Sequence, residues 1–165
     1  MIEIEVNKEL IDRAKSRTSS VSRTSTLLHK YGSEKKRIFE GYLGEEIVKD
    51  YLDIRNIDDD YEYDLISNKG KRLEVKTISC KFKPHDDYLC TVNSSYLDSV
   101  RKQDADYYVF LRVLNNYETA WLLGYIECSK FFELGNFIEK GTDMGKFKFV
   151  KANATVLPIY KLNKF

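Results

Sequence analysis

A β-hairpin over Tyr61–Ser79 is the feature that most constrains this fold. Its two halves alternate apolar and polar residues on either side of the turn signal Asn68-Lys69-Gly70. A three-residue loop with Gly70 in the left-handed conformation pairs Leu65 with Leu73, so that the apolar sides of the two strands coincide. The register of the whole hairpin follows from this pairing, because side chains alternate between the faces of a strand.

This register brings two carboxylates together. Asp64 is expected directly opposite Glu74, with Lys76 two residues farther along on the same face. Facing carboxylates repel each other, but a divalent cation between them reverses that interaction, and Mg²⁺ prefers oxygen ligands. A lysine beside such a site suits phosphodiester chemistry, where it offsets charge that builds up on phosphorus. The alternative is a Glu-x-Lys sequence on the solvated face of an edge hairpin, without a function.

The spacing of these residues resembles the core of the PD-(D/E)XK nuclease superfamily. Its members carry an acidic residue on one strand and Glu-x-Lys on the next, which corresponds here to Asp64 followed by Glu74-Val75-Lys76. Tyr63 stands where the motif has its proline. The order of elements from about residue 38 onward is similar to that of small phage-encoded members.

The resemblance implies a metal site. Asp64 and Glu74 would bind Mg²⁺, or Mn²⁺ in its place, with the Val75 carbonyl as a further ligand. Members also tend to carry a glutamate on a helix before the hairpin, and the Gly-x-x-Gly-Glu pattern selects Glu45 as a catalytic residue. The spacing alone leaves Glu46 open, since adjacent helical residues point about 100° apart.

Composition is that of one domain with a substantial core: 165 residues, 42% of them hydrophobic. Lys and Arg number 27 against 26 Asp and Glu, so the overall charge indicates no partner. The three cysteines form no Cys-x-x-Cys pair, which argues for reduced thiols. Without a membrane-spanning apolar run or a signal-peptide pattern, we expect a soluble protein with no membrane partner, in the cytoplasm of a bacterial or phage-infected cell.

Residues 1–37 differ from the rest in charge. Between Arg13 and Arg37 there are eight Lys and Arg but one acid, Glu34. We interpret this region as a basic, partly flexible N-terminal extension that contacts DNA phosphates, with a solvated tail as the alternative. Residues 38–165 are expected to form a single nuclease-like α/β domain.

Two basic segments supply the predicted DNA contacts. In the extension these residues are Arg17, Arg23, Lys35, Lys36 and Arg37. In the loop that follows the hairpin they are Lys81, Lys83 and His85. Two further candidates for the site, spaced as in some exonuclease branches of the superfamily, are Gln103 and Tyr107.

The remaining pattern predicts helices around a sheet. Helical spacing of apolar residues indicates helices over 34–52 and 130–138. Strands are expected over 61–67, 71–79, 88–93, 107–114 and 118–126. The fold class is therefore α/β, with a mixed, twisted sheet of about five strands flanked by helices, similar to the restriction-endonuclease core.

Together these features predict a metal-dependent endonuclease that hydrolyses DNA phosphodiester bonds in phage or bacterial DNA processing. The ion would lower the pKa of a bound water, and Lys76 would act as a positive clamp, because nearby carboxylates favour its charged form. The alternative is a catalytically inactive DNA-binding or structural module of the same fold. Exonuclease activity, the preferred DNA structure, RNA as substrate and a homodimer stay open.

Overall fold

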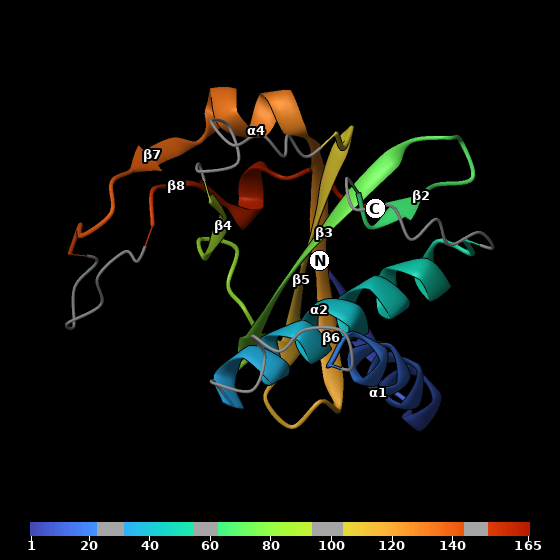
Figure 1. Ribbon diagram of the computed structural model, residues 1–165. Coiled ribbons are helices and arrows are strands. Elements are labelled where there is room, and N and C mark those ends of the chain that lie inside the picture. Colours follow the sequence, from blue (N-terminus) through green and yellow to red (C-terminus); the bar gives the residue numbers. More distant parts are fainter. Residues whose placement is uncertain (23–31, 55–62, 94–103, 144–151) are drawn as a thin grey trace.

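A mixed five-stranded sheet forms the centre of the protein. The computed structural model describes residues 1–22, 32–54, 63–93, 104–143 and 152–165 (Figure 1). The strand order is β1-β6-β5-β3-β2, and β3 and β5 are parallel while the other neighbours are antiparallel. The predicted α/β class with a mixed sheet of about five strands is thus confirmed. The strand expected over 88–93 belongs to a second sheet, and β1 is the fifth strand here instead. The strands are β1 (Ile2–Glu5), β2 (Leu65–Ile66), β3 (Arg72–Cys80), β5 (Tyr107–Leu114) and β6 (Thr119–Glu127).

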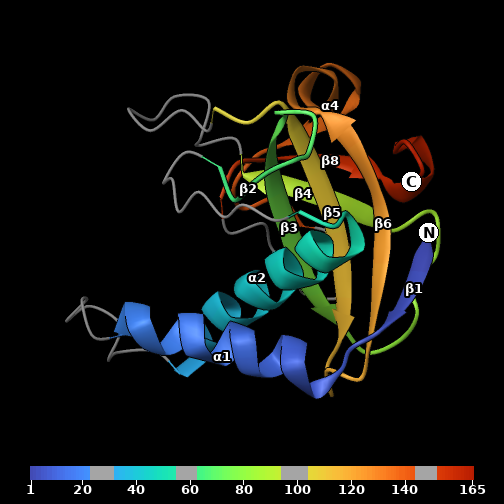
Figure 2. The ribbon, with the colours of Figure 1, turned by 90° about the vertical axis from the view of Figure 1, so that its right-hand side faces the viewer.

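Two helices, α1 (Lys8–Ser22) and α2 (Gly32–Tyr51), cover one face of this sheet (Figure 2). Leu43, Ile47 and Val48 of α2 are buried in a core that also contains Leu73 and Val109 of the sheet. Leu43 and Ile47 are four residues apart and Val48 comes next, which is the helical spacing of apolar residues that the sequence predicted. This spacing fixes which side of α2 faces the sheet.

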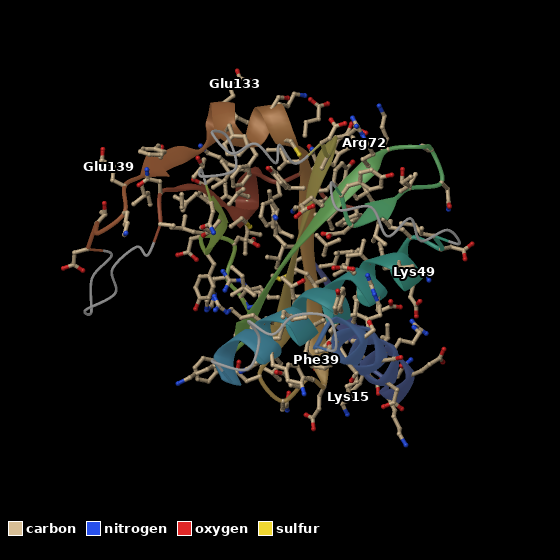
Figure 3. The ribbon with its side chains drawn as sticks, in the orientation of Figure 1. Lys15, Phe39, Lys49, Arg72, Glu133 and Glu139 are labelled. Atoms are coloured by element: carbon tan, nitrogen blue, oxygen red, sulfur yellow. The ribbon has the colours of Figure 1, made fainter. Side chains whose placement is uncertain are left out.

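The N-terminal end of α2 is attached to the turn between β5 and β6. The ring of Phe39 lies edge-on to Tyr117, with centroids 5.1 Å apart (Figure 3). The Tyr117 hydroxyl donates to Glu40 Oε1 at 3.2 Å. These contacts hold α2 across the sheet, and Glu45 follows a little more than one turn later.

A second, smaller sheet lies on the opposite face. It has the order β4 (Leu89–Asn93), β8 (Ala154–Pro158) and β7 (Asn136–Ile138), and it is accompanied by α4 (Cys128–Leu134) and η2 (Ile159–Lys161). Phe131 is fully buried there, with its ring 5.3 Å from Phe110. The second core formed in this way supports the face of β3 and β5 that carries Lys76 and Tyr108.

The helix predicted over 130–138 is shorter than expected. α4 ends at Leu134, Gly135 is extended, and the next three residues form β7. A Cβ on Gly135 would overlap the Thr155 side chain of β8. The glycine therefore allows a close approach of the chain to β8, and pairing with that strand replaces further helical turns.

Residues 1–22 are part of the fold, which corrects the partly flexible extension expected from their composition. β1 pairs with β6, and α1 buries Leu10 and Ala14 in the core. The polar composition misleads because hydroxyl groups of α1 bond to carbonyls of their own helix, such as Thr18 Oγ1 to Ala14 O at 2.8 Å. Within the described ranges, no helix is both long enough and apolar enough to cross a membrane.

Candidate active site

The hairpin has the register that the sequence predicted. Leu65 is paired with Leu73. The Ser67 N–H donates to the Lys71 carbonyl at 2.8 Å, and Gly70 has a φ of 71°. A three-residue loop with a left-handed glycine therefore closes the hairpin, and this fixes the positions of the acids on both strands.

Asp64 lies just beyond the end of the β2–β3 ladder. Its N–H still donates to the Leu73 carbonyl, at 3.0 Å. Its carboxylate then accepts the Val75 N–H through Oδ2, at 2.7 Å. The Asp64 carboxylate thus accepts the Val75 N–H, a hydrogen bond that the backbone would have made if the β2–β3 ladder had continued. The ladder pairs of β2 and β3 are Leu65–Leu73 and Ile66–Arg72, so Asp64 and Glu74 are not the directly opposed ladder pair that was expected.

Three carboxylates from separate parts of the chain nevertheless act on one another. Asp64 follows α2 in the chain and precedes β2, Glu74 lies on β3, and Glu45 lies on α2. Burial and the charge of Glu74 raise the pKa of Asp64 to about 7, against the Val75 hydrogen bond and the positive charges of Lys76 and Arg17. Like charges in a poorly hydrated place favour protonation. The three acids therefore form one electrostatic unit.

Glu45 is a residue of α2 on which the hairpin acids act. Burial and the charges of Asp64 and Glu74 raise the pKa of Glu45 to about 8, while Arg17 lowers it. Both glutamates are buried, with exposed fractions of 8% and 2%. Glu46 accepts hydrogen bonds from Arg13 Nε at 2.9 Å and Arg17 Nη1 at 3.1 Å instead. The electrostatic influence of Asp64 and Glu74 on Glu45 favours Glu45 as the helix acid of this cluster.

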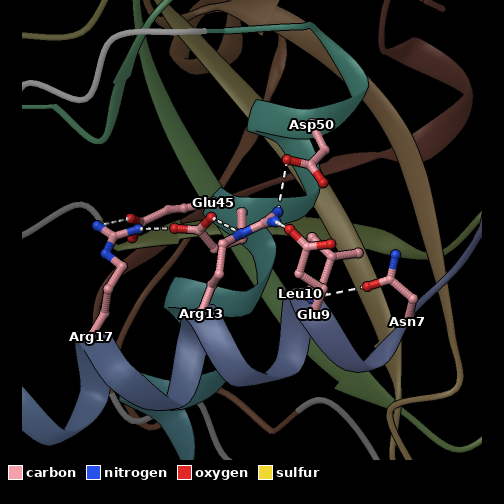
Figure 4. A network of polar contacts seen from close by, with 8 residues as sticks. Asn7, Glu9, Leu10, Arg13, Arg17, Glu45 and Asp50 are labelled. Atoms are coloured by element: carbon pink, nitrogen blue, oxygen red, sulfur yellow. Dashed lines mark hydrogen bonds and ion pairs between the residues drawn. The ribbon is translucent and has the colours of Figure 1, made fainter.

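Arg17 connects α1 to this acid cluster. Its Nη2 lies 2.6 Å from Glu45 Oε2 and its Nη1 3.1 Å from Glu46 Oε1, so the guanidinium spans two adjacent carboxylates (Figure 4). The same group lies over the Tyr42 ring, 4.2 Å from its centroid. A planar fork of donors suits this double contact. Arg17, predicted as a DNA contact, is thus placed in the interior of the site.

A sequence signal for this role was present in α1. Arg13 and Arg17 are four residues apart, so they lie on the same face of the helix. Arg13 contacts Glu46 and Asp50, the latter through Nη2 at 2.7 Å (Figure 4). Two arginines one turn apart on one helix can pair with acids on a neighbouring helix. Only the packing of α1 against α2 shows that these residues are partners.

Lys76 lies beside the acids, as the strand period predicted. Its Nζ is 2.6 Å from Glu74 Oε1 and 5.8 Å from the centre of the Tyr108 ring. The side chains of Lys76 and Glu74 are only 19% and 10% exposed. A mostly buried ammonium group next to carboxylates is strongly held and poorly hydrated. It is the second positive charge of the cluster, after Arg17.

The other predicted residues are distributed more widely. Lys35, Lys36 and Arg37 are exposed on α2, and Lys36 pairs with Glu40 at 3.5 Å. Lys81, Lys83 and His85 are exposed after β3, and Lys83 pairs with Glu3 at 2.9 Å. Tyr107 contacts the ring of Tyr125, with centroids 5.9 Å apart. Two of the predicted residues lie outside the described ranges: Arg23 and Gln103.

The donors in the cluster are of the type that a hard divalent cation takes. Carboxylates of Asp64, Glu74 and Glu45 and the backbone carbonyl of Val75 are all oxygen ligands. A cation would relieve the repulsion that raises the pKa of Asp64 and Glu45. Across the described residues, no three His, Cys, Asp or Glu side chains converge into a coordination geometry. The charges facing the acids here are Lys76 and Arg17.

Comparison with known proteins adds no relative. The sequence matches no protein-family model, and no curated protein matches it either.

Proposed function

We propose that this protein is a Mg²⁺-dependent nuclease that hydrolyses DNA phosphodiester bonds through a two-strand site of the PD-(D/E)XK type. One observation carries the proposal. Asp64 and Glu45 have raised pKa values, to which burial and the charge of Glu74 contribute, and Lys76 bonds to Glu74. Strongly raised carboxylate pKa values cluster at catalytic sites, where acids and bases need pKa values matched to their task.

The proposed cation would be held by Asp64 and Glu74, with the Val75 carbonyl as a further ligand. When bound, Mg²⁺ lowers the pKa of a coordinated water and neutralises charge on phosphate oxygens. The Val75 N–H fixes the Asp64 carboxylate by its bond to Oδ2. The ligand on one strand is therefore oriented by the backbone of the other, which preorganises the pair.

The remaining polar groups have roles in charge and proton transfer. Lys76 Nζ, now bonded to Glu74 Oε1, is placed to contact a phosphate oxygen and to offset the negative charge of the transition state. Glu45, whose pKa is raised to about 8, holds a proton at neutral pH and can exchange it with water in the site. Arg17 orients Glu45 through its bond to Oε2.

The test is a cleavage assay on a panel of linear, nicked, branched and single-stranded DNA, with RNA for comparison. We expect products with Mg²⁺ or Mn²⁺ and none with a chelator. Glu74→Gln, which keeps the shape of the side chain, should abolish cleavage. Glu139→Gln, at an exposed position, is the matched control and should cleave like the parent. Absence of products from every substrate with both metals would refute the proposal.

A structural or DNA-binding module without turnover is the second candidate. Its support is that the Lys76–Glu74 and Arg17–Glu45 ion pairs partly neutralise the acids without a metal. Against it, two carboxylates with raised pKa values lower the stability of the fold at neutral pH. A module without turnover gains nothing from that loss. DNA binding with no cleavage of the panel would favour the module.

A further inference from the structure

A cavity lies at the C-terminal end of α2, at the loop end of the hairpin. It has a volume of about 640 Å³ and is bounded by α2, the hairpin loop, β5, β6 and the C-terminal residues. This volume is in the range of small-molecule sites in proteins. Leu73 and Val109 of the central sheet are among its apolar wall residues.

Four aromatic rings in mutual contact form much of the wall. Phe165 lies 5.6 Å from Tyr51 and 5.1 Å from Tyr125, and Tyr125 lies 5.9 Å from Tyr107, measured between centroids. Tyr51 and Phe165 are 41% and 38% exposed. Large rings that are this accessible, and already held against one another, offer flat surfaces on which a planar group can stack.

Three lysines give the cavity a positive charge. Lys69 and Lys71 come from the hairpin loop and Lys164 from the C-terminal segment, and all three are exposed. Among the described residues that bound the cavity there is no acidic side chain. A ligand that matches this wall combines a planar aromatic group with a negative charge. The pattern of stacked rings and lysines is the one by which proteins hold nucleotides of single strands.

The cavity is held open by hydrogen bonds of the hairpin loop. Asn68 Nδ2 donates to the carbonyls of Leu52 and Asp53, at 3.3 and 3.2 Å. These carbonyls follow the last turn of α2, where backbone acceptors lack helical partners. Ser67 Oγ also accepts the Lys71 N–H at 3.0 Å. The rim is thus fixed to the helix before any ligand binds, which reduces the entropic cost of binding.

We propose that this cavity binds a nucleobase together with its phosphate, the base against the rings and the phosphate against the lysines. Ser67 comes three residues after Asp64 in the hairpin, which is about 10 Å along a strand and about the axial length of three nucleotides of one DNA strand. A nucleotide of the nuclease's own substrate is therefore one source of this ligand, and that part rests on the proposed function. A free nucleotide is the other source.

Binding is measured by NMR titration or calorimetry without metal. The probes are deoxyadenosine monophosphate, a short deoxyadenylate oligonucleotide, deoxyribose 5-phosphate and inorganic phosphate. We expect the first two to bind and to shift resonances of Tyr51 and Tyr125, and the last two to bind at least 5-fold more weakly. Phe165→Ala should weaken binding of the monophosphate by about 5- to 100-fold, and Phe165→Leu should bind no more tightly than the parent.

Matched controls lie a few residues away. Tyr160 is 61% exposed and does not bound the cavity, so Tyr160→Ala should leave binding unchanged. Lys164→Gln should weaken binding and reduce its salt dependence, whereas Lys161→Gln should do neither. Thermal melts of each variant separate a loss of ligand from a loss of folding.

Equal affinity for inorganic phosphate and the monophosphate would overturn the proposal, because the rings would then have no part. So would an unchanged affinity in Phe165→Ala. Competition between the oligonucleotide and the monophosphate assigns the cavity to a nucleotide within a strand, and binding of the monophosphate alone assigns it to free nucleotides. If the parent binds the monophosphate but cleaves nothing, the nuclease proposal fails and the cavity proposal stands.

Discussion

Arg17 supplies one of the two positive charges beside the acid cluster. Its guanidinium bonds to Glu45 at 2.6 Å and to Glu46 at 3.1 Å. Lys76 supplies the other positive charge, at 2.6 Å from Glu74. Each cation thus faces a different acid of the cluster. This division lets the two be tested separately, because Lys76 is proposed to touch the phosphate while Arg17 acts through Glu45.

Lys76→Met should abolish DNA cleavage while metal binding persists. Methionine keeps an apolar stem of similar length but removes the ammonium group that would offset charge on phosphorus. The loss of one such donor slows reactions by about 100- to 1,000-fold. Cleavage rates with Mg²⁺ and Mn²⁺ affinity by calorimetry are the measurements, with Lys140→Met at an exposed position as the control. A mutant that cuts at the parental rate would remove Lys76 from the mechanism.

Arg17→Met should shift to higher pH the limb of the pH–rate profile that follows the titration of Glu45. Arg17 lowers the pKa of Glu45, which is already raised to about 8 by burial and nearby charge. Without Arg17 that pKa rises further, so Glu45 loses its proton only at higher pH. Arg17→Lys should move the limb less, since it restores the charge but not the fork.

The matched control for this prediction is Arg13→Met. Arg13 contacts Glu46 and Asp50, and it has no bond to Glu45. It should therefore change stability without moving the limb. If both arginine variants moved the limb equally, the effect would belong to the α1–α2 contact as a whole and not to Glu45.

At the scale of elements, the crossing of α2 over β3 positions Glu45. Gly44, the residue before it, packs directly on Thr77 of β3, and a Cβ there would overlap Thr77 Oγ1. The missing side chain allows helix and sheet to approach closely at this point. The helical acid is thereby brought toward the hairpin acids, and the approach is a property of the pair of elements.

Gly44→Ala should destabilise the protein by about 1–3 kcal/mol, because the methyl group forces helix and strand apart. Gly41→Ala is the matched control on the same helix. A Cβ at Gly41 has no atom within 4 Å, so this variant should be neutral or more stable by about 0.5–1 kcal/mol. Denaturant unfolding measures both.

Thr77→Ala in the Gly44→Ala background should recover part of the stability, because it removes Oγ1 and Cγ2, two of the three Thr77 atoms that the new methyl group meets. The recovery should exceed the effect of Thr77→Ala alone, since the two positions are in contact. Equal stability of Gly44→Ala and Gly41→Ala would show that α2 is free to move away from β3.

At the scale of the whole molecule, the acid cluster makes stability depend on pH. The folded-state pKa values of Asp64 and Glu45 are about 7 and 8, above their ordinary values of 3.8 and 4.5. Between these limits the folded protein binds more protons than the unfolded chain. Stability contributed by these groups is therefore present below about pH 4 and is lost as the pH rises toward 8.

Asp64→Asn should stabilise the protein at pH 8 by roughly 1–2 kcal/mol, or about 2–8 °C in Tm. The amide oxygen can still accept the Val75 N–H, while the buried negative charge is gone. The gain should vanish near pH 4, where Asp64 is protonated in the folded state. Thermal melts across this range are the measurement, with Asp12→Asn at an exposed position of α1 as the control. A gain that is the same at both pH values would contradict the buried-charge argument.

The sequence by itself determined the features that depend on neighbours in the chain. The loop with Gly70 fixed the register of Leu65 and Leu73, and the period of a strand placed Glu74 and Lys76 on one face. The alternation of strand and helix patterns was enough for the α/β class. These signals are local because backbone geometry sets the direction of each side chain within a few residues.

Only the tertiary structure decided which residues become partners. The sequence could not choose between Glu45 and Glu46, and it placed Arg17 on a DNA-binding extension. It carried no sign that Phe165 would reach Tyr51, or that the β2–β3 ladder would end before Asp64. The physical reason is common to these cases. Burial and charge pairing are set by contacts between segments far apart in the chain, and no short-range period encodes them.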